Sequence, residues 1–128
     1  MSGLDGAILY DGAASAYHQI TFARVTGDGT VYTDAAWALK LFRQPGDATP
    51  EVTLTIDDGL TRTTNAADSQ VLSITITAAQ LTTLLDGSNQ VDVGFRWTVT
   101  PVGEDERGVP DGQGWEGKFT VKSQALIG

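Results

Sequence analysis

The 128-residue sequence contains no cysteine, so disulfide bonds and thiolate metal sites are excluded. It is also poor in positive charge: eight Lys and Arg residues stand against sixteen Asp and Glu residues, which gives a net charge of −8. Such a surface gains nothing from the release of nucleic-acid counterions, and anionic membranes repel it. We therefore expect neither a nucleic-acid partner nor a membrane partner.

Long apolar runs are missing as well, because no stretch approaches the roughly 20 residues of a transmembrane helix. The first residues lack the basic region and the apolar core of a signal peptide, so we expect a protein made in the cytoplasm. What is present is ordinary for a globular protein: 41% of the residues are hydrophobic and 19% are charged. The length predicts a single domain.

The clearest pattern in the sequence lies between residues 71 and 99. Apolar and polar side chains alternate over residues 71–76, as in a strand with one buried face. Residues 77–80, Thr-Ala-Ala-Gln, match a capping box, and leucines follow at helical spacing. Alternation resumes over residues 91–99. The pattern predicts a strand, a short helix over about residues 77–86 and a second strand, all crossing one core.

Further alternating segments surround this stretch. They cover residues 17–25, 37–41, 52–56, 60–64 and 115–121. Turns rich in Gly, Pro and Asp separate them, and Asp57-Asp58-Gly59 predicts a hairpin. Seven or so short strands favour an all-β fold, namely an immunoglobulin-like antiparallel β-sandwich, with barrel closure as an alternative. The aromatic residues on the apolar parity of the strands are predicted core residues: Trp37, Phe95, Trp97, Trp115 and Phe119.

Two segments are longer than this fold needs. Residues 1–16 form an N-terminal arm ahead of a single sandwich domain over residues 17–128. A terminal arm is commonly held loosely, or it adds a strand to a neighbouring subunit. The second segment is the loop over residues 101–114. We expect partner contacts from an apolar triplet in the arm and a charged run in the loop: Ile8, Leu9, Tyr10, Glu104, Asp105, Glu106 and Arg107.

No segment predicts catalysis or a cofactor. His18 is the only histidine, and no serine lies in a recognisable nucleophile elbow. A literal G-x-G-x-x-G over residues 112–117 lies between a loop and a strand, whereas a dinucleotide fingerprint precedes a helix. The acidic runs at 57–58 and 104–106 offer oxygen atoms to Ca²⁺ but lack the spacing of an EF-hand loop. We therefore predict no enzyme activity, no metal site and no cofactor.

Four segments together resemble a known family. They are Trp37 to Arg43, Pro50 to Gly59, Leu72 to Leu81 and Gly117 to Val121. Their order resembles small tailed-bacteriophage virion proteins and the immunoglobulin-like N-terminal module of phage upper-baseplate and tail-fibre-associated proteins. The resemblance spans roughly residues 20–122. The loop over residues 101–114 departs from the family's compact turn, and no fibre shaft or receptor-binding domain follows in this sequence.

The resemblance implies a non-enzymatic structural protein of the virion, present in several copies in the tail, the baseplate or the fibre attachment site. Its partners would be copies of itself and other phage structural proteins. A capsid decoration protein on the phage head is an alternative. A carbohydrate-binding module is a second alternative, but such a module requires exposed aromatic side chains, and the three tryptophans lie at predicted core positions.

Overall fold

A computed structural model describes residues 6–11, 30–109 and 116–123, together with the backbone of residues 15–23. These residues contain one helix and nine strands: β1 (Ile8–Tyr10), β2 (Ser15–Ala23), β3 (Ala36–Phe42), β4 (Val52–Ile56), β5 (Gly59–Ala66), β6 (Ser69–Thr77), α1 (Ala78–Leu85), β7 (Gln90–Thr100), β8 (Arg107–Gly108) and β9 (Glu116–Lys122). Within the described part of the chain, no helix is long and apolar enough to cross a membrane.

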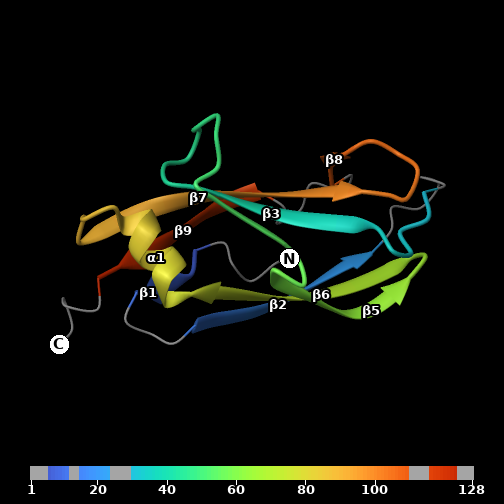
Figure 1. Ribbon diagram of the computed structural model, residues 1–128, viewed down its shortest axis with the longest axis horizontal. Coiled ribbons are helices and arrows are strands. Elements are labelled where there is room, and N and C mark those ends of the chain that lie inside the picture. The colour runs from blue at the N-terminus through green and yellow to red at the C-terminus, as the bar shows by residue number, and fades with distance from the viewer. Residues whose placement is uncertain (1–5, 12–14, 24–29, 110–115, 124–128) are drawn as a thin grey trace.

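The described strands form one curled sheet in the order β1-β9-β7-β3-β4-β5-β6-β2, with β8 paired to β7. Figure 1 shows two layers of this sheet, in which β3, β7 and β9 lie over β2, β5 and β6. Strands β4 and β5 connect the layers through two residue pairs. The all-β prediction is confirmed, whereas the immunoglobulin-like assignment stays a prediction.

The sheet is mixed, so the wholly antiparallel prediction is wrong. Strands β1 and β9 pair in parallel, and so do β4 and β5. The hairpin predicted at residues 57–59 is also wrong, because the chain turns from one layer into the other there. Asp57 and Gly59 have φ angles of 69° and 101°, in the left-handed region that Asp and Gly tolerate. Turn residues in a sequence predict that the chain changes direction, but they do not determine which strand the next segment pairs with.

Strand β6, helix α1 and strand β7 confirm the predicted strand, helix and strand. The Thr77 side-chain oxygen accepts a hydrogen bond from the Gln80 backbone N–H at 3.2 Å, and the Gln80 side chain accepts one from the Thr77 N–H at 2.9 Å. Both bonds of the capping box are therefore present. The helix ends at Leu85, and the two residues that follow it, Asp86 and Gly87, both have left-handed φ angles, of 50° and 82°.

The core lies between the two layers, with α1 across one end (Figure 1). Trp37 and Trp97 are 1% and 0% exposed, and their rings meet edge to face with 6.5 Å between centroids. Phe95 and Phe119 are also buried and lie 6.3 Å apart. Four of the five predicted aromatic core residues are confirmed, and Trp115 lies outside the described residues.

The N-terminal segment contributes to the chain's own sheet. Strand β1 pairs with β9, which places Leu9 opposite Val121 and buries it in the core. Strand β2 begins at Ser15, so the predicted boundary after residue 16 falls inside a strand. The predicted first strand is confirmed over residues 17–23, and residues 24 and 25 of that prediction lie outside the described residues.

The capping box yields a direct test. Thr77→Ala removes the oxygen that accepts from the first turn of α1, and we expect the free energy of unfolding to fall by about 1 kcal/mol in urea denaturation. Thr83→Ala is the matched control, because Thr83 lies inside the same helix, where Ala has the better helix propensity. Equal losses in both variants would contradict the role given to the cap.

Candidate functional site

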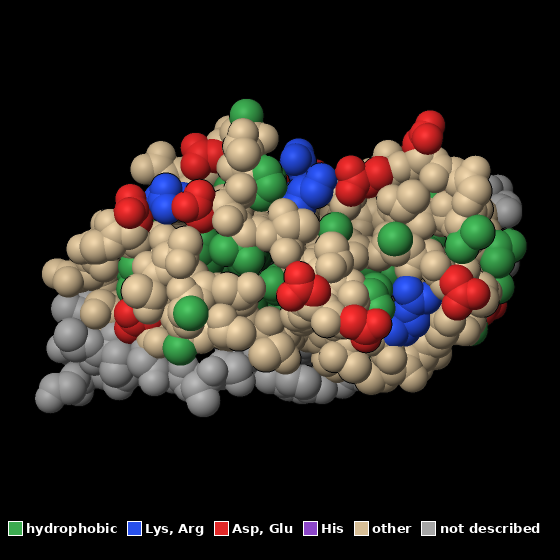
Figure 2. Space-filling model, viewed as in Figure 1, with side chains coloured by type: hydrophobic (Ala, Val, Ile, Leu, Met, Phe, Trp, Pro, Cys, Tyr) green, Lys and Arg blue, Asp and Glu red, His purple; other side chains and the backbone are tan. Residues whose placement is uncertain are grey.

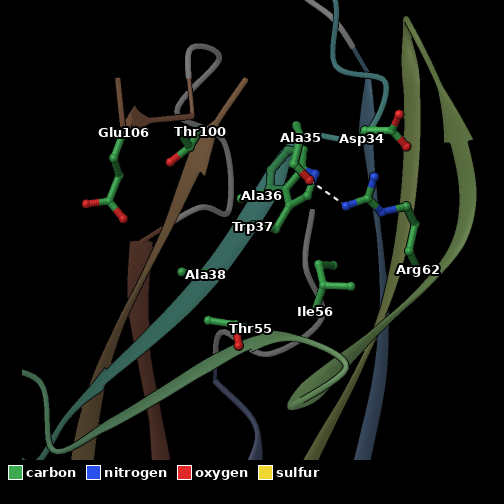
Figure 3. Close-up of a pocket in the computed structure, with 10 residues that line it drawn as sticks. All are labelled: Asp34, Ala35, Ala36, Trp37, Ala38, Thr55, Ile56, Arg62, Thr100 and Glu106. Atoms are coloured by element: carbon green, nitrogen blue, oxygen red, sulfur yellow. Dashed lines mark hydrogen bonds between the residues drawn. The ribbon is translucent and has the colours of Figure 1, made fainter. Parts of the chain in front are cut away.

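A groove of about 380 Å³ lies beside the start of β3 (Figure 3). Most of its lining residues are small or apolar: Ala35, Ala36, Trp37, Ala38, Thr55, Ile56 and Thr100. Three charged residues complete the lining: Asp34, Arg62 and Glu106. In Figure 3, Arg62 and Glu106 lie on opposite sides of β3. The groove is therefore a small-residue channel with a positive group on one side and a negative group on the other.

The groove opens where β4 leaves β3. The two strands pair as far as Ala38 and Thr55, and the chain then turns away through Gly59. Gly59 is required at this turn, because a Cβ there would lie 2.6 Å from the Leu54 side chain. Arg62 of β5 reaches across the gap, and its Nη2 donates a hydrogen bond to the Ala35 carbonyl (Figure 3). The side chain thus supplies a donor where β4 no longer lies beside β3.

Asn65 is the centre of a hydrogen-bond network at this end of the groove. Its Oδ1 accepts from the Asp34 backbone N–H at 2.8 Å, from Arg62 Nη1 at 3.0 Å and from Gln70 Nε2 at 2.9 Å. Its Nδ2 donates to Asp34 Oδ1 at 2.7 Å. Asp34 has a φ of 60°, and its two hydrogen bonds with the Asn65 side chain hold it in that left-handed conformation.

Gln70 carries the network into the core. It is 0% exposed, and its Oε1 accepts a hydrogen bond from Trp37 Nε1 at 3.2 Å. Its Nε2 also donates to the Ala66 carbonyl at 3.0 Å. A buried amide is stable only when its polar atoms are paired, and here both of them are. The network therefore ties β5 and β6 to the start of β3, across the two layers.

Glu106 lies on the other side of the groove and is bound to the outer face of β3 and β7. Its Oε2 accepts a hydrogen bond from the Thr98 hydroxyl at 2.9 Å, and its Oε1 accepts one from Lys40 Nζ at 3.3 Å. The bond from Thr98 is the main cause that holds the pKa of Glu106 below its usual range. Partial burial opposes this shift, and the charges of Lys40 and Arg96 favour it.

The positive charges near this face lie in mixed clusters. Figure 2 shows Lys and Arg side chains next to Asp and Glu side chains. Arg43 contacts Glu51 and also lies 3.8 Å from Asp86, and Lys40 contacts Glu106. Arg43 and Lys40 are therefore paired with acidic groups of the same chain.

The described lining residues of the groove show no assembled reaction centre. Among its described lining residues, Thr55 and Thr100 carry the only hydroxyl groups, and neither forms a nucleophile–base hydrogen bond in the contacts described above. Arg62 and Glu106 are both engaged within the chain.

The predicted contact residues of the arm have different positions. Ile8 is 52% exposed, whereas Leu9 is 8% exposed and belongs to the core. Tyr10 is half-buried and lies opposite Lys122. Of this triplet, Ile8 offers the apolar surface to a partner.

Of the predicted contact residues of the loop, Glu104, Glu106 and Arg107 have contacts within the chain itself. Strand β8 folds the loop back along β7, so that Arg107 lies opposite Val99. Arg107 donates to the Thr30 hydroxyl at 2.7 Å and lies 3.5 Å from Glu104. Glu104 and Asp105 are exposed.

The arm and the loop are not brought together. Strand β1 lies beside the part of β9 that pairs with residues 90–92 of β7, whereas β8 pairs with residues 98–99 of β7. Seven residues of a strand span about 23 Å. The two sets of predicted contacts therefore lie at different ends of one layer.

The other residues considered from the sequence show no assembled site. His18 lies opposite Ile74 in the pairing of β2 with β6, and its side chain is outside the described part of the structure. Asp57 and Asp58 line a separate hollow of about 350 Å³ near Gln80. Across the described residues, no three His, Cys, Asp or Glu side chains gather as a metal site. Residues 112–115 lie outside the described ranges, and Glu116 and Gly117 begin strand β9.

Sequence reasoning missed the network around Asn65. The signal was present at Gln70, which shares the strand parity of Leu72 and Ile74 and is therefore a polar residue at a core position. A buried amide needs partners, so this parity pointed to a network. It did not show that Asn65 and Asp34 would supply it, because their approach depends on the fold of the β5–β6 turn.

No protein-family model matches this chain, and no curated protein is similar to it.

The network predicts a specific loss of stability. Asn65→Ala removes the oxygen shared by three donors, and we expect the free energy of unfolding to fall by about 1–3 kcal/mol in urea denaturation. Asn89→Ala is the matched control, since Asn89 is an exposed asparagine just before β7. An Asn65→Ala protein as stable as the parent would show that water replaces the network without penalty.

Glu106 predicts a pH dependence of stability. Because its pKa is lower in the folded state, the ionised carboxylate stabilises the fold above the unfolded-state pKa of about 4.3, and this contribution is lost as the pH falls through the folded-state value. The parent should exceed Glu106→Gln in stability above about pH 5, and the difference should vanish in stronger acid. The side chain is half exposed, so the difference should stay below about 1 kcal/mol.

Urea denaturation of both proteins across this pH range measures the difference. Glu104→Gln removes a charge from the same loop and corrects for the change in net charge. A difference that grows as the pH falls would refute the assignment of the shift to Glu106.

Proposed function

We propose that this protein is a non-enzymatic structural component of a tailed-phage virion, present in several copies in the tail, the baseplate or the fibre attachment site. The fold class proposed with it is the immunoglobulin-like sandwich. The proposal starts from the four segments that resemble the phage family. These segments form β3, β4, the end of β6 with α1, and β9, so they all surround one core.

The proposal depends mainly on which parts of the surface are available for contacts with other proteins. Trp37 and Trp97 are buried, and the charged groups of the groove are engaged within the chain. In the part of the chain that the structure describes, the sheet edges and the exposed loop positions remain available, and these are usual contact regions of a β protein. A structural component needs such contacts and no reaction centre.

The proposed contacts with other virion proteins lie at the two ends of the layer formed by β3, β7 and β9. Ile8 is the exposed apolar group of β1, and Glu104 and Asp105 are exposed charged groups of the loop before β8. Because these groups lie at different ends of the layer, they would serve two separate contacts, one apolar at Ile8 and one charged at the loop.

A carbohydrate-binding module is less well supported. Such a module stacks sugar rings on exposed aromatic side chains. Trp37 and Trp97 are at most 1% exposed, so neither offers a stacking surface.

The test is to locate the protein on purified virions of the phage that encodes it. We expect it to copurify with virions in several copies and to be labelled at the tail by specific antibodies in electron microscopy. Label on the head would favour the capsid decoration protein instead. Absence from purified virions, or hydrolase activity that His18→Ala abolishes, would overturn the proposal.

A further inference from the structure

Strand β2 ends the sheet with a long edge. It pairs with β6 through nine consecutive residue pairs, from Ser15–Thr77 to Ala23–Ser69, without a register shift. Among the described residues β6 is its only strand partner. Nine residues present an edge about 30 Å long. The opposite end of the sheet is β1, which has three residues.

The sequence of β2 has none of the features that usually protect an edge. It reads Ser-Ala-Tyr-His-Gln-Ile-Thr-Phe-Ala, without Pro, Gly, Lys, Arg, Asp or Glu. Monomeric proteins protect such edges with charges, prolines, bulges or short strands. A strand of this length whose own sequence lacks these features predicts that another strand pairs with it.

The whole lower layer is nearly free of charge. Strands β2, β5 and β6 contain 26 residues and a single charged one, Arg62. Strands β1, β3, β7 and β9 contain 28 residues and six charged ones: Lys40, Asp92, Arg96, Glu116, Lys118 and Lys122. The described exposed side chains of β6 are Thr75 and Thr77, both neutral.

This distribution favours a second copy of the chain as the partner. Two copies with a net charge of −8 repel each other, and they approach with least repulsion through the layer that carries no acidic residue. Interface centres are depleted of charged residues in the same way. A partner attracted by the acidic groups would be drawn to other parts of the surface, because these groups lie outside the three strands.

We propose that two copies of this protein join along β2, in antiparallel orientation, so that their sheets continue into each other across a two-fold axis. Symmetric pairing over all nine residues centres the axis on Gln19, which then faces Gln19 of the other copy. No like charges oppose each other in this pairing. The dimer is independent of the virion assignment, since the purified protein alone tests it.

A charge exchange at Gln19 tests the pairing. Gln19→Lys and Gln19→Glu each place like charges opposite each other, and we expect each variant alone to dimerise about fivefold more weakly than the parent at low salt. An equimolar mixture of the two variants places opposite charges across the axis and should recover dimerisation. Analytical ultracentrifugation over a range of concentrations measures all three samples. Recovery in the mixture also shows that both variants fold.

The matched control introduces the same two charges, Lys or Glu, at a position of the same layer that is not in β2. Thr63 is an exposed residue of β5 in the same layer, so Thr63→Lys and Thr63→Glu alter the charge of the layer and leave the β2 edge unchanged. Both should dimerise like the parent. A parent that stays monomeric at every concentration, or Thr63 variants that behave like the Gln19 variants, would overturn the proposal.

Hydrogen exchange of the parent gives a second readout that needs no substitution. Backbone amides of residues 15–23 should exchange more slowly as the protein concentration rises, because the new strand pairing protects them. A dimer in which exchange along β2 is independent of concentration would place the interface elsewhere and refute the pairing.

Discussion

The side-chain amide of Asn65 holds the two layers together at the point where the sheet divides. Strand β4 leaves β3 at Ala38, and the next strand lies in the other layer. Beyond that point the start of β3 is tied to β5 and β6 by side chains, through Asn65, Gln70 and Arg62. The groove exists because this connection bridges the gap without filling it. The same network reaches the core through the hydrogen bond from Trp37 to Gln70, beside the contact of Trp37 with Trp97.

The elements that could be predicted are those encoded in neighbouring residues. Alternation before Thr77 and the capping box after it determine β6 and α1 locally, and the parity of Trp97 and Phe119 determines which face is buried. The pairing of distant segments leaves no such local pattern. For that reason the parallel partner of β1, the crossing from β4 to β5 and strand β8 were not predicted, and neither was the contact of Asn65 with Asp34.

The two layers differ in chemistry as well as in position. The layer of β3, β7 and β9 carries charges of both signs, and Lys40 and Glu106 are paired with each other there. Such a face is well hydrated and resists nonspecific association. The layer of β2, β5 and β6 carries a single charged residue, Arg62, and its described exposed residues include several neutral threonines. One curled sheet thus presents a face suited to solvent and a face suited to close contact.

The parallel pairing of β1 with β9 limits the order in which the strands can form during synthesis. Ile8 pairs with Thr120, 112 residues later in the chain. During synthesis the first strand therefore leaves the ribosome long before its partner exists, whereas β6, α1 and β7 are complete once residue 100 has emerged. Contacts between such distant segments form late, because closing a long loop is entropically unfavourable. Leu9 can reach its buried position beside Val121 only after β9 has been made, so we expect its apolar side chain to be exposed until then.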